Sequence, residues 1–96
     1  MRTWEEYKER AKASSPQVKV DLEQAEQLAG IVHSLIERRT ELGLSQRQLS
    51  ELCGLPQSSV ARIETMKTIP NVETVLRITQ PLGLRLTLVD EAVSQV

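Results

Sequence analysis

The chain has 96 residues, which is room for one compact domain with a short extension and too little for two separate cores. Its hydrophobic residues are almost all aliphatic, with no Phe, one Trp and one Tyr, which predicts an all-helical core and disfavours a platform that stacks single-stranded bases. A single Cys and a single His exclude an internal disulfide and leave too few ligands for a metal site, and the net charge of −1 excludes a strongly basic protein.

The first twenty residues are expected to form a helical extension followed by a linker. Residues 3–13 have the spacing of an amphipathic helix, and Trp4 and Tyr7 begin its apolar stripe. Pro16 then interrupts the pattern, and we expect the chain to be extended from there up to residue 20. Residues 1–20 are therefore interpreted as an N-terminal helical extension and linker.

One long helix is expected over residues 22–42, because apolar residues keep helical spacing across this segment. Asp21 has the residue type of an N-cap, and Gln24 stands at the reciprocal position of a capping box. Gly43 suits the left-handed backbone that ends many helices. This helix opens the main domain, which we assign to residues 21–83.

Two short helices and a tight turn are expected next. Ser45 and Gln48 have the spacing of a capping box at the start of the first helix. The turn Gly54-Leu55-Pro56 separates it from a second helix over residues 57–65.

The last part of the chain combines a helix with a strand pattern. Asn71 is expected to cap a helix that ends near residues 79–80, because Pro81 cannot extend it normally. Beyond it the apolar period changes to two, which is typical of a strand, with Leu84, Leu86 and Leu88 on one face. Such a strand has no partner in a helical chain, so we expect it to pair with the same strand of a second copy in a homodimer. Residues 84–96 are assigned to this strand and a tail.

Residues 44–64 have the pattern of two short helices that a Gly-containing turn joins into a helix-turn-helix. In that arrangement the second helix enters the major groove of DNA with its N-terminal residues leading. Apolar residues at fixed offsets are expected to hold the two helices together, namely Leu49, Leu52, Leu55, Val60 and Ile63. Gln57, Ser58 and Arg62 face away from them, and Gln and Arg side chains match adenine and guanine edges. A plain helical hairpin with a polar outer face is the alternative.

A specific set of positions supports the first interpretation, namely Gly43-Leu44-Ser45-Gln46, Leu49, Leu52-Cys53-Gly54-Leu55, Ser59-Val60, Ile63-Glu64, Pro70, Glu73-Thr74-Val75 and Leu82-Gly83. With these residues the chain resembles the phage-repressor-like (Xre/Cro) helix-turn-helix family over residues 32–84, without gaps. The resemblance implies that Gln57, Ser58 and Arg62 contact bases. It also implies that the DNA backbone is contacted by Gln46, Ser59 and Lys67, and Arg47 is expected to join them. Thr65-Met66 departs from the family pattern, which often has Gly at the second position, and Met tolerates a positive φ poorly.

Other polar residues are given structural roles. His33 is expected to be a structural histidine, and Cys53 a small core residue. Arg38 and Arg39 end the long helix, where they either complement the helix dipole or contact a backbone phosphate.

The extensions outside the motif resemble small antitoxins of the HigA and HipB types. Such a resemblance implies a repressor that regulates its own operon and binds a small ribonuclease-like toxin, with Trp4 and Tyr7 as candidate toxin contacts. The alternative for these two side chains is that they pack on the long helix. Residues 30–89 carry seven basic and five acidic side chains, so tight DNA binding would need two copies on an inverted repeat.

Two further hypotheses are kept beside the antitoxin. One is a stand-alone or phage-derived regulator without a toxin, and the other is a helical interaction module that does not bind DNA. We expect neither an enzyme nor a cofactor. No N-terminal signal core and no apolar stretch long enough to cross a bilayer is visible, so we expect a cytoplasmic protein.

Overall fold

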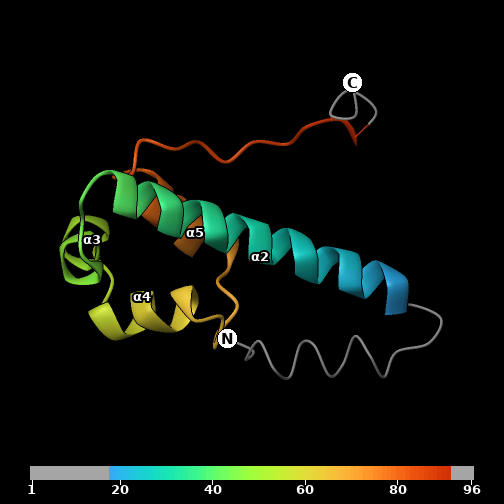
Figure 1. The fold of residues 1–96 in the computed structure, drawn as a ribbon, viewed down its shortest axis with the longest axis horizontal. Coiled ribbons are helices and arrows are strands. Elements are labelled where there is room, and N and C mark those ends of the chain that lie inside the picture. Colours follow the sequence, from blue (N-terminus) through green and yellow to red (C-terminus); the bar gives the residue numbers. More distant parts are fainter. Residues whose placement is uncertain (1–17, 92–96) are drawn as a thin grey trace.

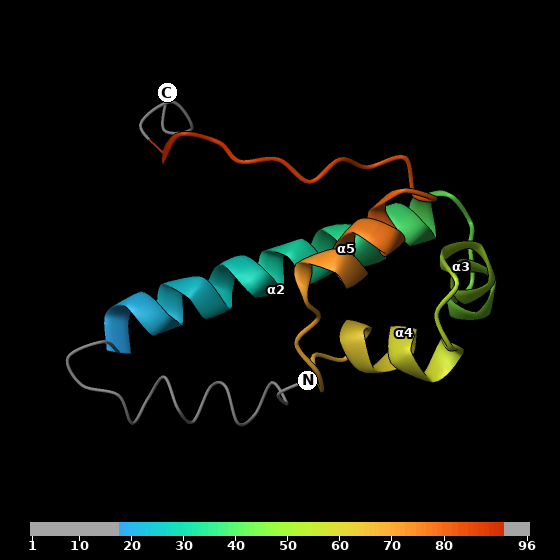
Figure 2. The ribbon, with the colours of Figure 1, turned by 180° about the vertical axis from the view of Figure 1, so that it is seen from behind.

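The computed structural model describes the backbone of residues 18–91, and residues 1–17 and 92–96 lie outside the described part. Within residues 18–91 the chain forms four helices, which are α2 (Val18–Glu41), α3 (Gln46–Cys53), α4 (Gln57–Glu64) and α5 (Val72–Thr79). The three short helices gather around the C-terminal half of α2, and the first turns of α2 extend beyond them (Figure 1). Seen from behind, α5 lies in front of α2, and α4 lies below both (Figure 2). The predicted all-helical domain is confirmed for these residues, while the helix predicted over 3–13 lies outside them, together with Trp4 and Tyr7.

α2 begins earlier than the sequence predicted. We expected residues 18–20 to be extended and Asp21 to cap the helix, and both expectations are wrong, because Asp21 lies inside α2. Val18 stands four residues before Leu22, so helical spacing continues upstream of the apparent cap, and no Pro or Gly interrupts it. The capping-box pattern marks a possible helix start, and here the longer helix forms instead.

The core is aliphatic, as the composition predicted. Its buried residues come from the C-terminal half of α2, from each short helix and from the turn after α5, and they are Val32, Leu35, Leu49, Val60, Ile63, Ile78 and Leu82. The inward positions predicted at Leu49, Val60 and Ile63 are confirmed. The same residues that make the core therefore hold α3 and α4 against each other and against α2.

Leu52 was expected to point inward with Leu49, and this expectation is wrong, because 58% of Leu52 is exposed. In α3, Leu49 and Ser50 are buried and Cys53 is half-buried. Ser50 follows Leu49 by one residue and Cys53 follows it by four. Successive helix positions are separated by about 100°, so this buried face is centred away from position 52. Leu52 instead lines a shallow hollow on the outer side of α3, together with Leu44, Gln48 and Glu51.

Local side-chain bonds start α3 and α5 as predicted. Ser45 Oγ accepts from the backbone N–H of Gln48 at 3.0 Å, and Gln48 Oε1 accepts from the N–H of Ser45 at 2.8 Å. Asn71 Oδ1 accepts from the N–H of Thr74 at 2.8 Å. These bonds satisfy N–H groups that have no acceptor within their own helix. α5 then ends at Thr79, two residues before Pro81.

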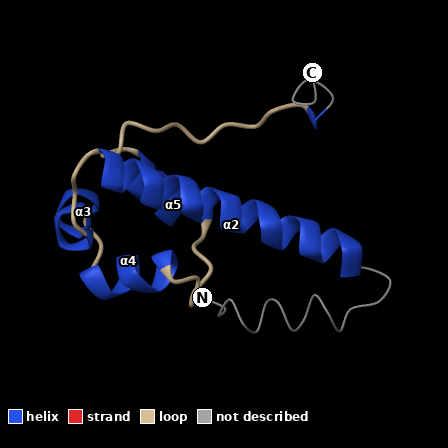
Figure 3. Ribbon diagram, in the orientation of Figure 1, coloured by secondary structure: helices blue, strands red, loops and turns tan. Residues whose placement is uncertain are grey.

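Residues 84–90 leave α5 and return along α2 as an irregular segment, with neither helix nor strand bonding in this single chain (Figure 3). Leu84 packs against the core, whereas Leu86 is 37% exposed and Leu88 is 98% exposed. A strand needs a hydrogen-bonded neighbour, so a single chain does not test the predicted pairing between two copies.

Candidate DNA interface

The turn between α3 and α4 fixes how the second helix is presented. Gly54 caps α3 in the left-handed region at φ 76, where residues other than Gly are strained. The N–H groups of Gly54 and Leu55 both donate to the carbonyl of Ser50, at 3.0 and 3.2 Å. Pro56 is the N-cap of α4 with φ −61, a value to which its ring is already restricted. A tightly bonded turn thus sets the position at which α4 begins.

α4 has one buried and one exposed side. Val60 and Ile63 are buried, whereas the predicted base-contacting residues Gln57, Ser58 and Arg62 are exposed. Ser59 is half-buried beside them. The first turn of α4 therefore offers short and amide side chains to an approaching partner, with an arginine one turn further along.

The cations near α4 differ from the other arginines of the helices, because they have no ion-pair partner in the described part of the chain. Among residues 18–91, neither Arg62 nor Lys67 is within reach of a carboxylate, and both are exposed. Lys67 follows α4 directly, and its backbone N–H donates to the carbonyl of Arg62 at 2.8 Å. The ion-paired arginines are Arg38, Arg39, Arg47 and Arg77. Unpaired cations are available to neutralise phosphate.

Arg47, a predicted backbone contact, is exposed on α3. Its Nε lies 3.9 Å from Glu51 Oε1, and both side chains are largely exposed. A surface pair of this kind contributes roughly 0–1 kcal/mol, so it would exchange readily for a phosphate.

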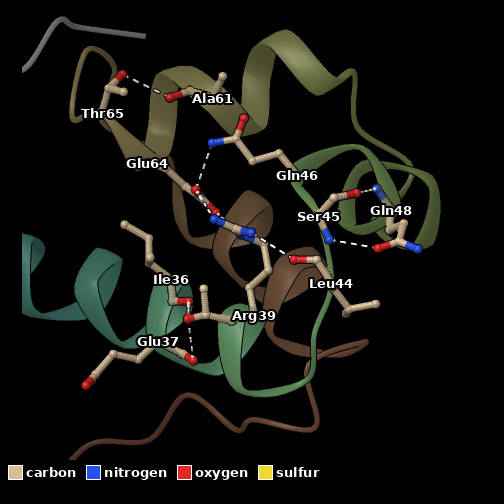
Figure 4. Close-up of polar contacts among 11 residues, drawn as sticks. Ile36, Glu37, Arg39, Leu44, Ser45, Gln46, Gln48, Ala61, Glu64 and Thr65 are labelled. Carbon is tan, nitrogen blue, oxygen red and sulfur yellow. Dashed lines mark hydrogen bonds and ion pairs between the residues drawn. The ribbon is translucent and has the colours of Figure 1, made fainter.

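A cluster of polar groups joins α2, α3 and α4, and we call it the Glu64 cluster after its central residue; it comprises Arg39, Leu44, Gln46 and Glu64 (Figure 4). Arg39 donates from Nε to Glu64 Oε2 at 2.7 Å and from Nη2 to Oε1 at 2.9 Å. Its Nη1 donates to the carbonyl of Leu44 at 2.8 Å. The two charged side chains are only 14% and 8% exposed, so the pair is largely removed from solvent.

Gln46, a predicted phosphate contact, belongs to the same cluster. Its Nε2 donates to Glu64 Oε1 at 2.9 Å, and the side chain is half-buried. Sequence reasoning missed the pairing of Arg39 with Glu64, since the two residues are 25 positions apart and only the fold brings them together. Two sequence features could have indicated this pairing, namely the Ile63-Glu64 dipeptide at the end of α4 and an arginine in the last turn of α2.

Arg38 is half-buried and bonds to another part of the domain. Its Nε donates to the carbonyl of Leu82 at 2.9 Å, which ties α2 to the turn after α5, and Nη1 lies 3.9 Å from Glu41. Of the two roles left open for the arginine pair, a phosphate contact finds no support in this geometry.

The predicted dimer contacts Leu84, Leu86 and Leu88 lie apart from this surface. Residues 84–90 and α4 are on opposite sides of α2 (Figures 1 and 2). The described residues contain no group of His, Cys, Asp or Glu that could hold a metal ion. None of their helices is long and apolar enough to cross a membrane.

Comparison with known proteins gives one family and several relatives. A family model described as Helix-turn-helix matches residues 35–89. A Haemophilus influenzae protein named "Uncharacterized HTH-type transcriptional regulator" is 44% identical over 59 residues, which are 62% of this chain and 60% of that protein. The "HTH-type transcriptional regulator PuuR" of Escherichia coli is 40% identical over 53 residues, 55% of this chain and 29% of the regulator.

The "Antitoxin HigA1" of Mycobacterium tuberculosis is 34% identical over 79 residues, 82% of this chain and 53% of the antitoxin. The chain therefore spans at most 60% of the length of these relatives. No solved structure matches it at a comparable level of significance. Since the family model covers more than half of the sequence and matches the α3–turn–α4 unit described above, the chain belongs to the Xre-like helix-turn-helix family.

Proposed function

We propose that the chain is a sequence-specific DNA-binding repressor that inserts α4 into the major groove. The observation that carries this proposal is the exposed polar side of α4, with Arg62 and Lys67 unpaired among the described residues. In this arrangement Gln57, Ser58 and Arg62 contact base edges. The phosphates on either side are bound by Gln46, Arg47, Ser59 and Lys67.

The experiment that tests the proposal is selection of bound sequences from a pool of random duplexes. The expected product is an inverted repeat whose half-sites are about one helical turn apart, because a two-fold dimer presents two copies of α4. Failure to enrich any sequence, with no affinity for duplex DNA even at low salt, would contradict the proposal. That result would favour the interaction module, which needs no DNA.

The homodimer is part of the proposal. Leu86 and Leu88 alternate along an irregular segment and leave apolar surface exposed, which an antiparallel copy of the segment would cover. Pairing would also give each strand the hydrogen-bonded neighbour that it lacks in the single chain. A dimer doubles the cations on the DNA, which compensates for the small basic excess of one copy.

We propose further that the repressor is the antitoxin of a toxin–antitoxin pair and acts in the cytoplasm on its own operon. The relative named as an antitoxin supports this role, and the relatives named as transcriptional regulators support the alternative of a regulator without a toxin. Expression of the adjacent reading frame separates the two. If the chain is an antitoxin, expression of the adjacent reading frame alone arrests growth, and co-expression of this chain restores growth in a way that requires Trp4 and Tyr7. If the chain is a regulator without a toxin, neither effect occurs.

A further inference from the structure

We propose that Glu64 is a positioning residue for DNA binding, which holds the amide nitrogen of Gln46 toward a backbone phosphate. The inference rests on the proposed function and adds a role for a residue that does not itself touch DNA.

The first step is the orientation of the Gln46 amide. Glu64 accepts three hydrogen bonds in the Glu64 cluster, two from Arg39 and one from Gln46. An ionised carboxylate has no hydrogen to donate, so the group of Gln46 that faces it must be the nitrogen. The carboxylate of Glu64 thus keeps the nitrogen of the Gln46 amide, and not its oxygen, next to Glu64.

The second step concerns the hydrogen that is left. An amide nitrogen carries two N–H groups, and Glu64 takes one of them. Among the described residues no acceptor is assigned to the other. An unanchored glutamine would present its carbonyl oxygen as readily as its nitrogen, and the oxygen would repel a phosphate. Anchoring therefore keeps a donor directed at the anion and lowers the entropy lost on binding.

The third step is the link between helices. Gln46 is the first residue of α3, Glu64 is the last residue of α4, and Arg39 belongs to α2. The positive end of the α3 dipole attracts an anion to the same place. The bond between Gln46 and Glu64 consequently fixes the position of the phosphate contact relative to the C-terminal end of α4. A single position of the domain on DNA can then satisfy the phosphate contact and the base contacts together.

The test is a double-mutant cycle on affinity for a short mixed-sequence duplex, since a phosphate contact is independent of sequence. The Gln46→Ala variant is measured in the wild-type chain and in a chain carrying Arg39→Met and Glu64→Leu. The double replacement removes the buried pair but keeps apolar packing, which preserves folding in comparable cases. We expect Gln46→Ala to lower affinity about tenfold in the wild type and about twofold or less in the double variant.

The salt dependence distinguishes a neutral phosphate contact, such as that of Gln46, from a contact made by a charged side chain. Gln46 is neutral, so Gln46→Ala should leave the slope of log affinity against log salt unaltered. The control Lys67→Ala should reduce that slope by about 0.9. An equal loss from Gln46→Ala in both backgrounds would overturn the inference while leaving the proposed function intact. No affinity of the wild type for duplex at low salt would overturn both.

A measurement on the wild-type chain keeps the test independent of the folding of the chain that carries Arg39→Met and Glu64→Leu. The side-chain amide signals of Gln46 are assigned in an NMR spectrum by their loss in Gln46→Ala, and the duplex is then added. We expect the signal of the unbonded amide proton to shift on binding. Signals that stay in place while other α3 resonances shift would overturn the inference.

Discussion

Arg62 and Lys67 both lack an ion-pair partner within residues 18–91, yet we expect them to act differently on DNA. Arg62→Ala should cost on the order of 1–3 kcal/mol on the selected operator and relax the preference at one base pair, because a forked guanidinium contact to guanine is lost. Lys67→Ala should weaken binding to all sequences alike and flatten the salt dependence. Titrations of both variants against operator and mixed-sequence duplex check this.

Arg85 offers a matched control for these titrations. It is exposed and has no ion-pair partner among residues 18–91, but it lies in the segment on the other side of α2 from α4. Arg85→Ala should therefore leave the salt slope nearly unchanged. If Arg62→Ala behaves like this control on the operator, the assignment of base contacts is wrong.

The positive φ of Met66 leads to a prediction about stability. It takes φ 63, the left-handed region that costs an L residue roughly 1–2 kcal/mol, while its half-buried side chain packs against the core. Met66→Gly and Met66→Ala lose the same packing to a similar extent, but only Gly relieves the backbone strain. We expect the Gly variant to be more stable than the Ala variant by about 1 kcal/mol in urea unfolding. Equal midpoints would show that no strain is stored at this position.

Among the elements, the segment of residues 84–90 carries the prediction about assembly. Leu86→Asp places a charge at the centre of the apolar face that two copies are proposed to share, so the protein should become monomeric. Leu86→Val keeps an apolar, strand-favouring side chain and is the matched control. Sedimentation velocity of the two variants decides the matter, and a Leu86→Asp protein that stays dimeric rules out strand pairing.

The N-terminal residues carry a separate prediction. Removal of residues 1–14 leaves α2 complete, because that helix begins at Val18. The truncated protein should therefore keep the dimer and its affinity for DNA, while losing any binding of a toxin that Trp4 and Tyr7 provide. A truncated protein that sediments as a monomer would instead assign the dimer contact to the removed residues.

At the scale of the whole molecule, most expectations that rested on local chemistry were confirmed. Ser45 and Asn71 cap the helices they were expected to cap, because the bonds involve residues only three positions away. Leu49 is buried as its spacing predicted. Local reasoning also explains one error, since Asp21 has the pattern of a cap but lies within a longer helix.

What the sequence did not predict depends on packing between distant segments. The bond of Arg39 to Glu64 forms only when α2 and α4 are placed together by the core. Leu52 is exposed because the core selects which side of α3 faces inward, and that choice is made by residues of other helices. Met66 is held at a positive φ by the chain on either side of it, against its own preference.

The separation of charges within the described residues affects how the molecule meets DNA. Glu23 and Glu26 lie on the first half of α2, which extends beyond the short helices, whereas Arg62 and Lys67 lie at the end of α4 and directly after it. Within the described residues these charges are separated along the molecule, although the net charge of the chain is only −1. In the proposed binding mode, the field of a duplex acts on this separation and turns the α4 side toward the phosphates before contact. Rotation in that field raises the fraction of collisions that are productive, an advantage that added salt removes.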